Sequence, residues 1–287
     1  MRNLDIATLR SLQAVAEFGA VTRAADALNM TQSALSMQMK RLEEVFGRPM
    51  LERSGRGVML SDFAQDLLGE SRKLVALNDA ILSRFTGARP HLRLRVGLTS
   101  DWLFDRVAQA VRAFRRDNPQ VELVINDARS KDLRVQMRRG DHDVILTTEF
   151  DAPPGAIHLA KVDLAWFGAV GGRAWRERPL PIANSPHCAY YPVGMAALED
   201  AGIESVHVVG EGGSDTWRVL AAADLGITIL PRGISQSGLE VVEHGGALPP
   251  LPPTWLNVYV ADGPSRMVAA DFASYLRRTV CELAQAA

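Results

Sequence analysis

Three short helical patterns follow one another between Ile6 and Gly47, and this run constrains the chain more than any other feature. Apolar residues recur at helical spacing in each pattern, which predicts three amphipathic helices. We expect Gly19 and Gly47 to end the first and third helices, because glycine readily takes the left-handed conformation of a helix cap. Thr22 and Thr31 are placed to cap the second and third helices.

The third of these helices has one apolar and one polar face. Leu35, Met39 and Leu42 lie on its inward face, and the small pair Ala24-Ala25 lets the second helix pack closely. The outward face carries Gln32, Ser33, Ser36, Met37 and Lys40. A helix-turn-helix has this layout, and its second helix enters the major groove of double-stranded DNA.

The outward side chains suit different parts of a DNA duplex. Gln32 and Ser36 can hydrogen-bond to base edges, whereas Lys40 suits a phosphate. Met37 offers only apolar contact, for example to a thymine methyl group. Thr31, at the start of the helix, and Ser33 complete the candidate DNA-binding set on this helix.

Residues 48–60 alternate apolar and polar residues around glycines, which predicts a β-hairpin, or wing. Arg53 and Arg56 on this wing would lie beside phosphates or a minor groove. The 287-residue chain has a formal net charge of −1, so DNA affinity has to come from a locally basic face. We therefore add Arg53 and Arg56 to the candidate DNA-binding residues.

A long helix is predicted over residues 61–85. Leu60, Leu67, Leu74 and Ile81 recur at every seventh position, which is the spacing of a coiled-coil stripe. A helix that packs only on its own domain would show similar spacing. Its length and its place after a wing favour a helix that pairs two chains.

Residues 86–90 read as a hinge, and beyond them strand and helix patterns alternate. Such a series predicts a largely parallel sheet with helices on both faces. The first expected elements are strands at 92–98, 121–125 and 143–146 and helices at 103–116 and 130–139. Later ones are strands at 165–169, 207–209, 227–230 and 256–261 and helices at 194–201, 216–223 and 269–284.

The amino-terminal residues resemble the DNA-binding domain of the LysR-type transcriptional regulators. The matching positions are Ala16, Gly19, Thr22, Ala24-Ala25, Leu28, Thr31-Gln32-Ser33-Ala34, Ser36, Leu42-Glu43, Phe46-Gly47, Arg53 and Leu60-Ser61. Weaker matches lie in the second half, at Arg139-Gly140-x-x-Asp143-Val144 and in residues 223–231. The family usually carries a glycine where Asp224 stands here.

The resemblance implies an α/β protein of three parts. Residues 1–60 would form a winged helix-turn-helix and residues 61–88 a linker and dimerisation helix. Residues 89–287 would form a regulatory domain of two α/β subdomains, similar in fold to periplasmic solute-binding proteins. The implied function is DNA-binding transcriptional regulation controlled by a small-molecule effector. The implied assembly is a homodimer that pairs into a homotetramer, with RNA polymerase as a further partner.

In such a fold the effector lies at the carboxyl ends of strands and the amino ends of helices. By resemblance, its contacts here would be Ser100, Ser130, Thr147 and Ser214. The alternative for each hydroxyl is that it only caps its helix. An acidic residue beside the first helix start, Asp101, would repel an anion, so a zwitterionic, cationic or neutral effector stays open.

Other functions have weaker support in the sequence. No catalytic constellation, metal-ligand cluster or cofactor motif is visible, which disfavours an α/β enzyme with an accessory helical domain. A solute-binding protein has no need of a helix-turn-helix and normally carries a secretory signal, so the helix-turn-helix pattern and the missing signal both argue against this class. Cys188 and Cys281 fit free thiols in a reducing cytoplasm, and no stretch suits a membrane span. Redox sensing through Cys188 remains an alternative.

Overall fold

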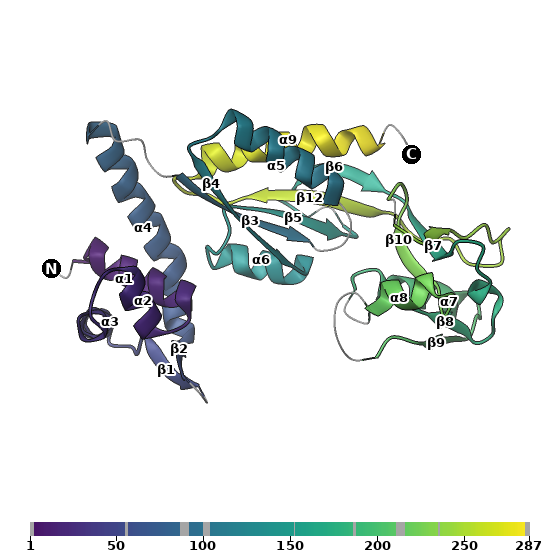
Figure 1. The fold of residues 1–287 in the computed structure, drawn as a ribbon, viewed down its shortest axis with the longest axis horizontal. Coiled ribbons are helices and arrows are strands. Elements are labelled where there is room, and N and C mark those ends of the chain that lie inside the picture. Colours follow the sequence, from purple (N-terminus) through teal and green to yellow (C-terminus); the bar gives the residue numbers. More distant parts are fainter. Residues whose placement is uncertain are drawn as a thin grey trace.

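The computed structural model describes residues 3–54, 57–86, 92–99, 104–151, 153–185, 188–210, 216–234 and 236–284. Figure 1 shows an amino-terminal helical unit, a long helix beside it, and two α/β units farther along the chain. We call residues 3–75 the head, because residues 61–75 pack into the same core as the helices before them. Subdomain I consists of residues 92–162 and 254–284, and subdomain II of residues 164–250.

The head contains three helices and a two-stranded antiparallel hairpin. They are α1 (Ile6–Phe18), α2 (Val21–Ala27), α3 (Gln32–Phe46), β1 (Leu51–Ser54) and β2 (Gly57–Leu60). Gly19 and Gly47 end α1 and α3 with φ of 63° and 66°, as expected for left-handed caps. The Thr31 hydroxyl caps α3 by accepting the backbone N–H of Ala34.

The predicted cap of the second helix is wrong. Helix α2 begins at Val21, its capping position is Ala20, and no side chain caps it, so Thr22 lies inside the helix. Val21 packs against the core of the head, and the helix begins two residues earlier than a cap at Thr22 would allow. Both alanines of the small pair Ala24-Ala25 are buried where α2 meets the core.

The long helix α4 (Asp62–Thr86) belongs partly to the head and is partly exposed. Leu68 and Val75 are buried in the core of the head, and Leu60 and Leu67 pack there too. The seven-residue stripe therefore does not form one continuous pairing surface, because its first two members are used within the head. Its later members are accessible: Leu74 is 41% exposed and Ile81 51%.

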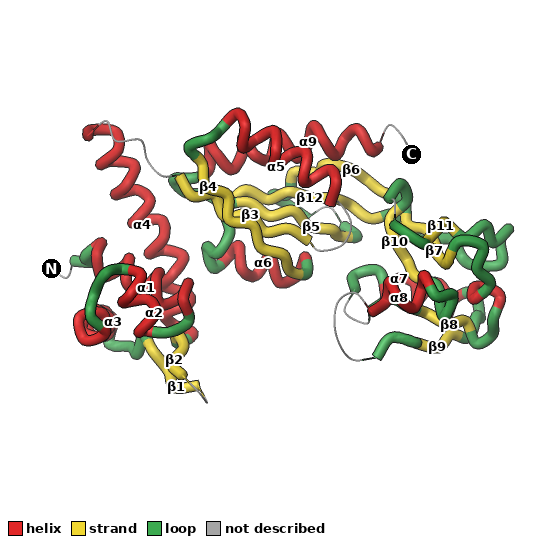
Figure 2. Tube along the Cα trace, in the orientation of Figure 1, coloured by secondary structure: helices red, strands yellow, loops and turns green. Residues whose placement is uncertain are grey.

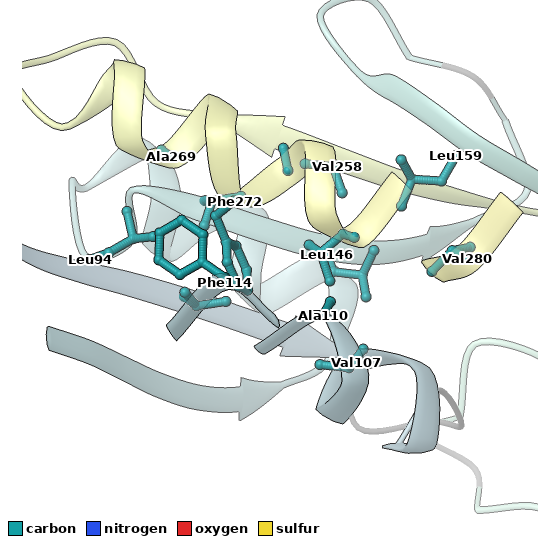
Figure 3. Packing of buried hydrophobic residues seen from close by; sticks show 14 of the residues in the cluster. Leu94, Val107, Ala110, Phe114, Leu146, Leu159, Val258, Ala269, Phe272 and Val280 are labelled. Carbon is teal, nitrogen blue, oxygen red and sulfur yellow. The ribbon is translucent and has the colours of Figure 1, made fainter. Parts of the chain in front are cut away.

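Subdomain I is a five-stranded sheet in the order β4-β3-β5-β12-β6. Its elements are β3 (Leu92–Thr99), α5 (Phe104–Asp117), β4 (Val121–Ala128), α6 (Ser130–Arg138), β5 (Val144–Glu149), β6 (Ile157–Val162), β12 (Thr254–Val260) and α9 (Arg266–Ala284). Strands β4, β3 and β5 are parallel, whereas β12 is antiparallel to both of its neighbours. Helices α5 and α9 lie on one face and α6 on the other (Figure 2). Phe114 and Phe272 meet edge to face, 5.1 Å between ring centroids, under α5 and α9 (Figure 3).

Subdomain II is smaller and less regular. It contains β7 (Leu164–Ala169), β8 (Leu180–Ile182), α7 (Tyr191–Asp200), β9 (Ser205–His207), α8 (Thr216–Ala222), β10 (Thr228–Pro231) and β11 (Leu239–Val241). Its three-stranded sheet, β10-β7-β11, is antiparallel, so the expected parallel order holds only in part. The strand predicted at 207–209 lies at Ser205–His207 instead.

Asp224 stands where the resemblance implies a glycine, at a backbone position with φ of 59°, which favours glycine. Its carboxylate accepts the backbone N–H groups of Arg173 and Ala174 at 2.8–3.0 Å. Aspartate tolerates this left-handed conformation better than most residues, because its short side chain can form local hydrogen bonds. The carboxylate thus offsets the cost of the backbone conformation by holding the loop at residues 172–174.

We expect Asp224→Ala to lower the free energy of unfolding by about 1–3 kcal/mol, because it removes these bonds and keeps the strained backbone. Asp224→Gly is the matched control, since it removes the same bonds but relieves the strain, and it should cost less. Chemical denaturation of the two variants and the parent measures both effects. Equal stability of Asp224→Ala and the parent would contradict the role of the carboxylate.

Candidate DNA-reading and effector sites

The polar face of α3 is exposed. Gln32, Ser33, Ser36 and Lys40 are exposed, and Met37 is 57% exposed. On the opposite side of the helix, Leu35, Met39 and Leu42 are buried in the core of the head and fix its orientation. Figure 1 shows that α3 lies on the side of the head that faces away from the α/β units. The structure therefore presents all five predicted outward residues on one open surface.

A hydrogen bond ties the base of the wing to α3, and a second one closes the base of the wing. The Glu43 carboxylate of α3 accepts the backbone N–H of Met50 at 2.9 Å. The Ser61 hydroxyl, at the end of the wing, donates to the carbonyl of Pro49 at 2.6 Å. Arg53 lies in β1 opposite Val58, but its side chain is outside the described residues, as is the whole of Arg56.

Ser130 connects three elements at one end of the subdomain I sheet. It is the first residue of α6, and its hydroxyl accepts the backbone N–H of Thr148 in β5 at 2.9 Å. The same hydroxyl lies 3.4 Å from that of Thr99, the last residue of β3. The expectation that Ser130 caps α6 is wrong, because the capping position is Arg129 and no side chain caps the helix.

Neighbouring hydroxyls differ in how they are used. Thr147 is 0% exposed and donates to the Asn257 carbonyl at 3.4 Å, so its hydroxyl is engaged within the sheet. Thr148 is also buried, and its hydroxyl has no hydrogen-bond partner among the described residues. Ser100 and Ser214 lie outside the described residues.

A buried carboxylate that the sequence analysis missed lies at the end of β5. The Glu149 side chain is only 9% exposed and accepts bonds from Arg134 at 2.9 Å and Tyr259 at 2.7 Å. It also accepts the amide of Asn257, whose oxygen pairs with the His158 ring at 2.8 Å. Burial, together with the bond to Glu149, raises the pKa of the Tyr259 hydroxyl above its ordinary value.

This network sits where subdomain I meets subdomain II. Phe150 follows Glu149 directly, and its ring lies 6.3 Å from that of Tyr190 in subdomain II, edge to face. Strand β5 points toward subdomain II in Figure 1. The ends of β3 and β5 and the start of α6, with the hydroxyls of Thr99 and Ser130, are therefore placed at the boundary between the subdomains.

Cys188 lies just before α7 in subdomain II, and its sulfur is 3.9 Å from the amide nitrogen of Asn184. Cys281 lies on α9 in subdomain I. No group of three or more His, Cys, Asp or Glu side chains in the described part of the chain is arranged to hold a metal ion. None of the helices described here has the length and apolar character needed to cross a membrane.

Two family models match this chain over most of its length. The first, described as the bacterial regulatory helix-turn-helix protein of the lysR family, matches residues 6–65. The second, described as the LysR substrate binding domain, matches residues 87–280. The chain belongs to the LysR family of transcriptional regulators. This LysR regulator therefore pairs a DNA-binding head with an effector-binding domain, as the sequence analysis predicted.

Named relatives have the same organisation. The chain is 28% identical over 280 residues to the transcriptional regulator DgdR of Burkholderia cepacia, covering 96% of this chain and 94% of DgdR. Its fold is similar to full-length OxyR from Pseudomonas aeruginosa, with a TM-score of 0.69 at 18% identity, covering 99% and 98% of the two chains. It is also similar to CbnR in complex with its target DNA, with a TM-score of 0.56 at 19% identity, covering 96% and 100%.

Proposed function

We propose that this LysR regulator reads its operator with the exposed face of α3. The observation that carries the proposal is the open surface of Gln32, Ser33, Ser36, Met37 and Lys40, held outward by a buried apolar face. Side chains of this kind on a second helix reach base edges and phosphates in a major groove. Thr31 orders the start of the helix, and Arg53 and Arg56 of the wing are proposed to contact phosphates or the minor groove.

We expect Gln32→Ala to reduce the preference for an operator over random DNA by about 1–3 kcal/mol, because it removes a base contact. Glu70→Ala, an exposed position on α4 and not on α3, is the matched control and should leave the preference unchanged. Gel-shift titrations with an operator duplex, selected from random sequence, and with a scrambled duplex measure the effect. Equal weakening on both duplexes would contradict a base-reading role.

The effector is proposed to bind at the subdomain boundary, with Ser130 as its central contact. Ser130 combines a hydroxyl with the start of α6, where backbone N–H groups favour acceptor groups of a ligand. The Thr99 and Thr148 hydroxyls lie next to it, and we propose Ser100 and Ser214 as further contacts. Thr147 is assigned a supporting role, because its hydroxyl is buried and bonded to Asn257. These groups suit a small polar molecule.

A screen of small carboxylic acids, amino acids and amines by thermal shift tests this proposed site. A ligand that stabilises the parent should stabilise Ser130→Ala less, because one hydroxyl contact is worth about 0.5–1.5 kcal/mol. Thr279→Ala is the control, since its hydroxyl bonds only to carbonyls within α9. Identical shifts in the parent and Ser130→Ala would place the ligand elsewhere.

The proposed assembly is a homodimer through the exposed half of α4, and two dimers form a tetramer. Leu74, Leu77 and Ile81 supply an apolar face on that half of the helix. A two-fold dimer would place two α3 helices on a pseudo-palindromic operator. RNA polymerase is a proposed partner in transcription, and we place the regulator in the cytoplasm, where its DNA target lies.

A further inference from the structure

The head and subdomain I touch through two glycines whose backbones are in direct contact. Gly69 lies in the first third of α4, and Gly140 follows α6 in subdomain I. A Cβ atom at Gly69 would lie 2.6 Å from the carbonyl oxygen of Arg139. A Cβ at Gly140 would lie 2.7 Å from the Cα of Gly69. No side chain larger than hydrogen fits at Gly69 while this contact is made.

An arginine on each side clasps this contact. Arg72, one helical turn after Gly69, donates to the Gly140 carbonyl at 2.8 Å and pairs with Asp141. Arg95 of β3 donates to the same carbonyl at 2.6 Å and pairs with Asp143. Burial lowers the pKa of Arg72, and its bond to Asp141 opposes this. The Gly140 carbonyl is thus held from both the head and subdomain I.

The contact is narrow. A groove of about 310 Å³ runs along one side of it, between Glu70 and Lys73 of α4 and Arg138 of subdomain I. A second groove of about 280 Å³, lined by Leu68 and Arg139, runs along the other side. Beyond these grooves, the exposed side chains of Glu17 on α1 and Arg93 on β3 form an ion pair at 3.0 Å. A narrow polar contact of this kind can open without unfolding either unit.

Helix α6 joins this contact to the proposed effector site. Ser130 stands at its start and Gly140 just past its end, so the nine-residue helix spans about 13 Å between them. Leu133 is the only one of its residues that is fully buried. Its start is fixed by Ser130, through Thr148, and the loop after it by the clasp on Gly140. A tilt of α6 would therefore move Gly140 against Gly69.

We propose that the Gly69–Gly140 contact is a releasable lock, through which the Ser130 end of α6 sets the position of the DNA-reading head. This inference rests on the proposed effector site at Ser130. An effector that binds the locked and released arrangements with different affinity shifts the balance between them. The head then changes its position relative to subdomain I. In a dimer this also changes how the two heads are placed on DNA.

Cross-linking in the full-length protein tests the lock. The exposed pair Glu17 and Arg93 is changed to cysteines in a background of Cys188→Ser and Cys281→Ser, and a short bismaleimide is added. The locked form should give an intrachain cross-link, which is separated from interchain products by mass. Adding Gly69→Ala should lower the yield at least about fivefold, although alanine favours an isolated helix over glycine. Glu70→Ala, on the exposed side of α4, is the matched control and should leave the yield unchanged.

Circular dichroism melts establish that each variant is folded. A Gly69→Ala yield equal to that of the background would overturn the lock. Ser130→Ala should also change the yield, because it frees the start of α6, and an unchanged yield would overturn the link through α6. If ligands found by thermal shift stabilise Ser130→Ala as much as the parent, the proposed effector site is wrong. The cross-linking yield of Gly69→Ala still tests the lock in that case.

Discussion

Leu74→Asp combined with Ile81→Asp is expected to convert the regulator into monomers that no longer protect an operator from nuclease digestion. Both side chains are exposed on α4, and a paired helix would bury them. Burying an unpaired carboxylate costs about 3–5 kcal/mol. In a two-fold dimer each substitution is present in both chains, so each contributes this cost twice. We therefore expect the dissociation constant of the dimer to rise at least about a thousandfold.

Sedimentation velocity at micromolar concentration measures the change in assembly, and footprinting measures its consequence for DNA. Phe18→Asp, an exposed apolar residue on α1, is the matched control and should leave the dimer intact. A parent that sediments as a monomer would contradict pairing through α4. So would a double variant that still forms dimers.

Glu149→Leu is expected to lower the free energy of unfolding by about 2–4 kcal/mol. The substitution leaves the guanidinium of Arg134, the amide of Asn257 and the hydroxyl of Tyr259 without their shared acceptor. Removing one partner of a buried ion pair costs about 3–5 kcal/mol, and the partial exposure of Arg134 reduces this. Denaturation followed by tryptophan fluorescence measures the loss.

Glu149→Gln separates charge from shape. Its amide oxygen can still accept the Tyr259 hydroxyl, so it should cost less than Glu149→Leu. Because Glu149 adjoins Phe150 at the subdomain boundary, Glu149→Leu should also weaken the binding of any ligand found for the parent. A Glu149→Leu variant as stable as the parent would show that solvent replaces the lost acceptor.

The head could be read from the sequence because its signals are local. Gly19, Gly47 and Thr31 act on helices within a few residues of themselves, and the structure confirms all three. The prediction that Thr22 caps α2 was wrong, because the helix begins at Val21, which packs against the core of the head. The stripe on α4 was partly misread, because periodicity shows which residues share a face but does not show what covers it.

The α/β region was harder, because long-range pairing decides its details. Strands β8 and β11 have three residues each, too few for an alternating pattern. The Glu149 network joins residues more than a hundred positions apart, and no local spacing marks them. Ser130 was identified through the family resemblance, whereas its bond to Thr148 emerges only when β5 is placed beside β3.

The way subdomain II is attached has a consequence for how such regulators diversify. Val162, the last residue of β6, pairs directly with Thr254, the first residue of β12. Subdomain II is thus an insertion between two strands that a turn of about two to five residues would otherwise join into a hairpin. An insertion with adjacent ends can be exchanged as a cassette, because the host sheet keeps its register. One wall of the proposed effector site can therefore be recombined between paralogues while the head, α4 and α6 keep their own interfaces.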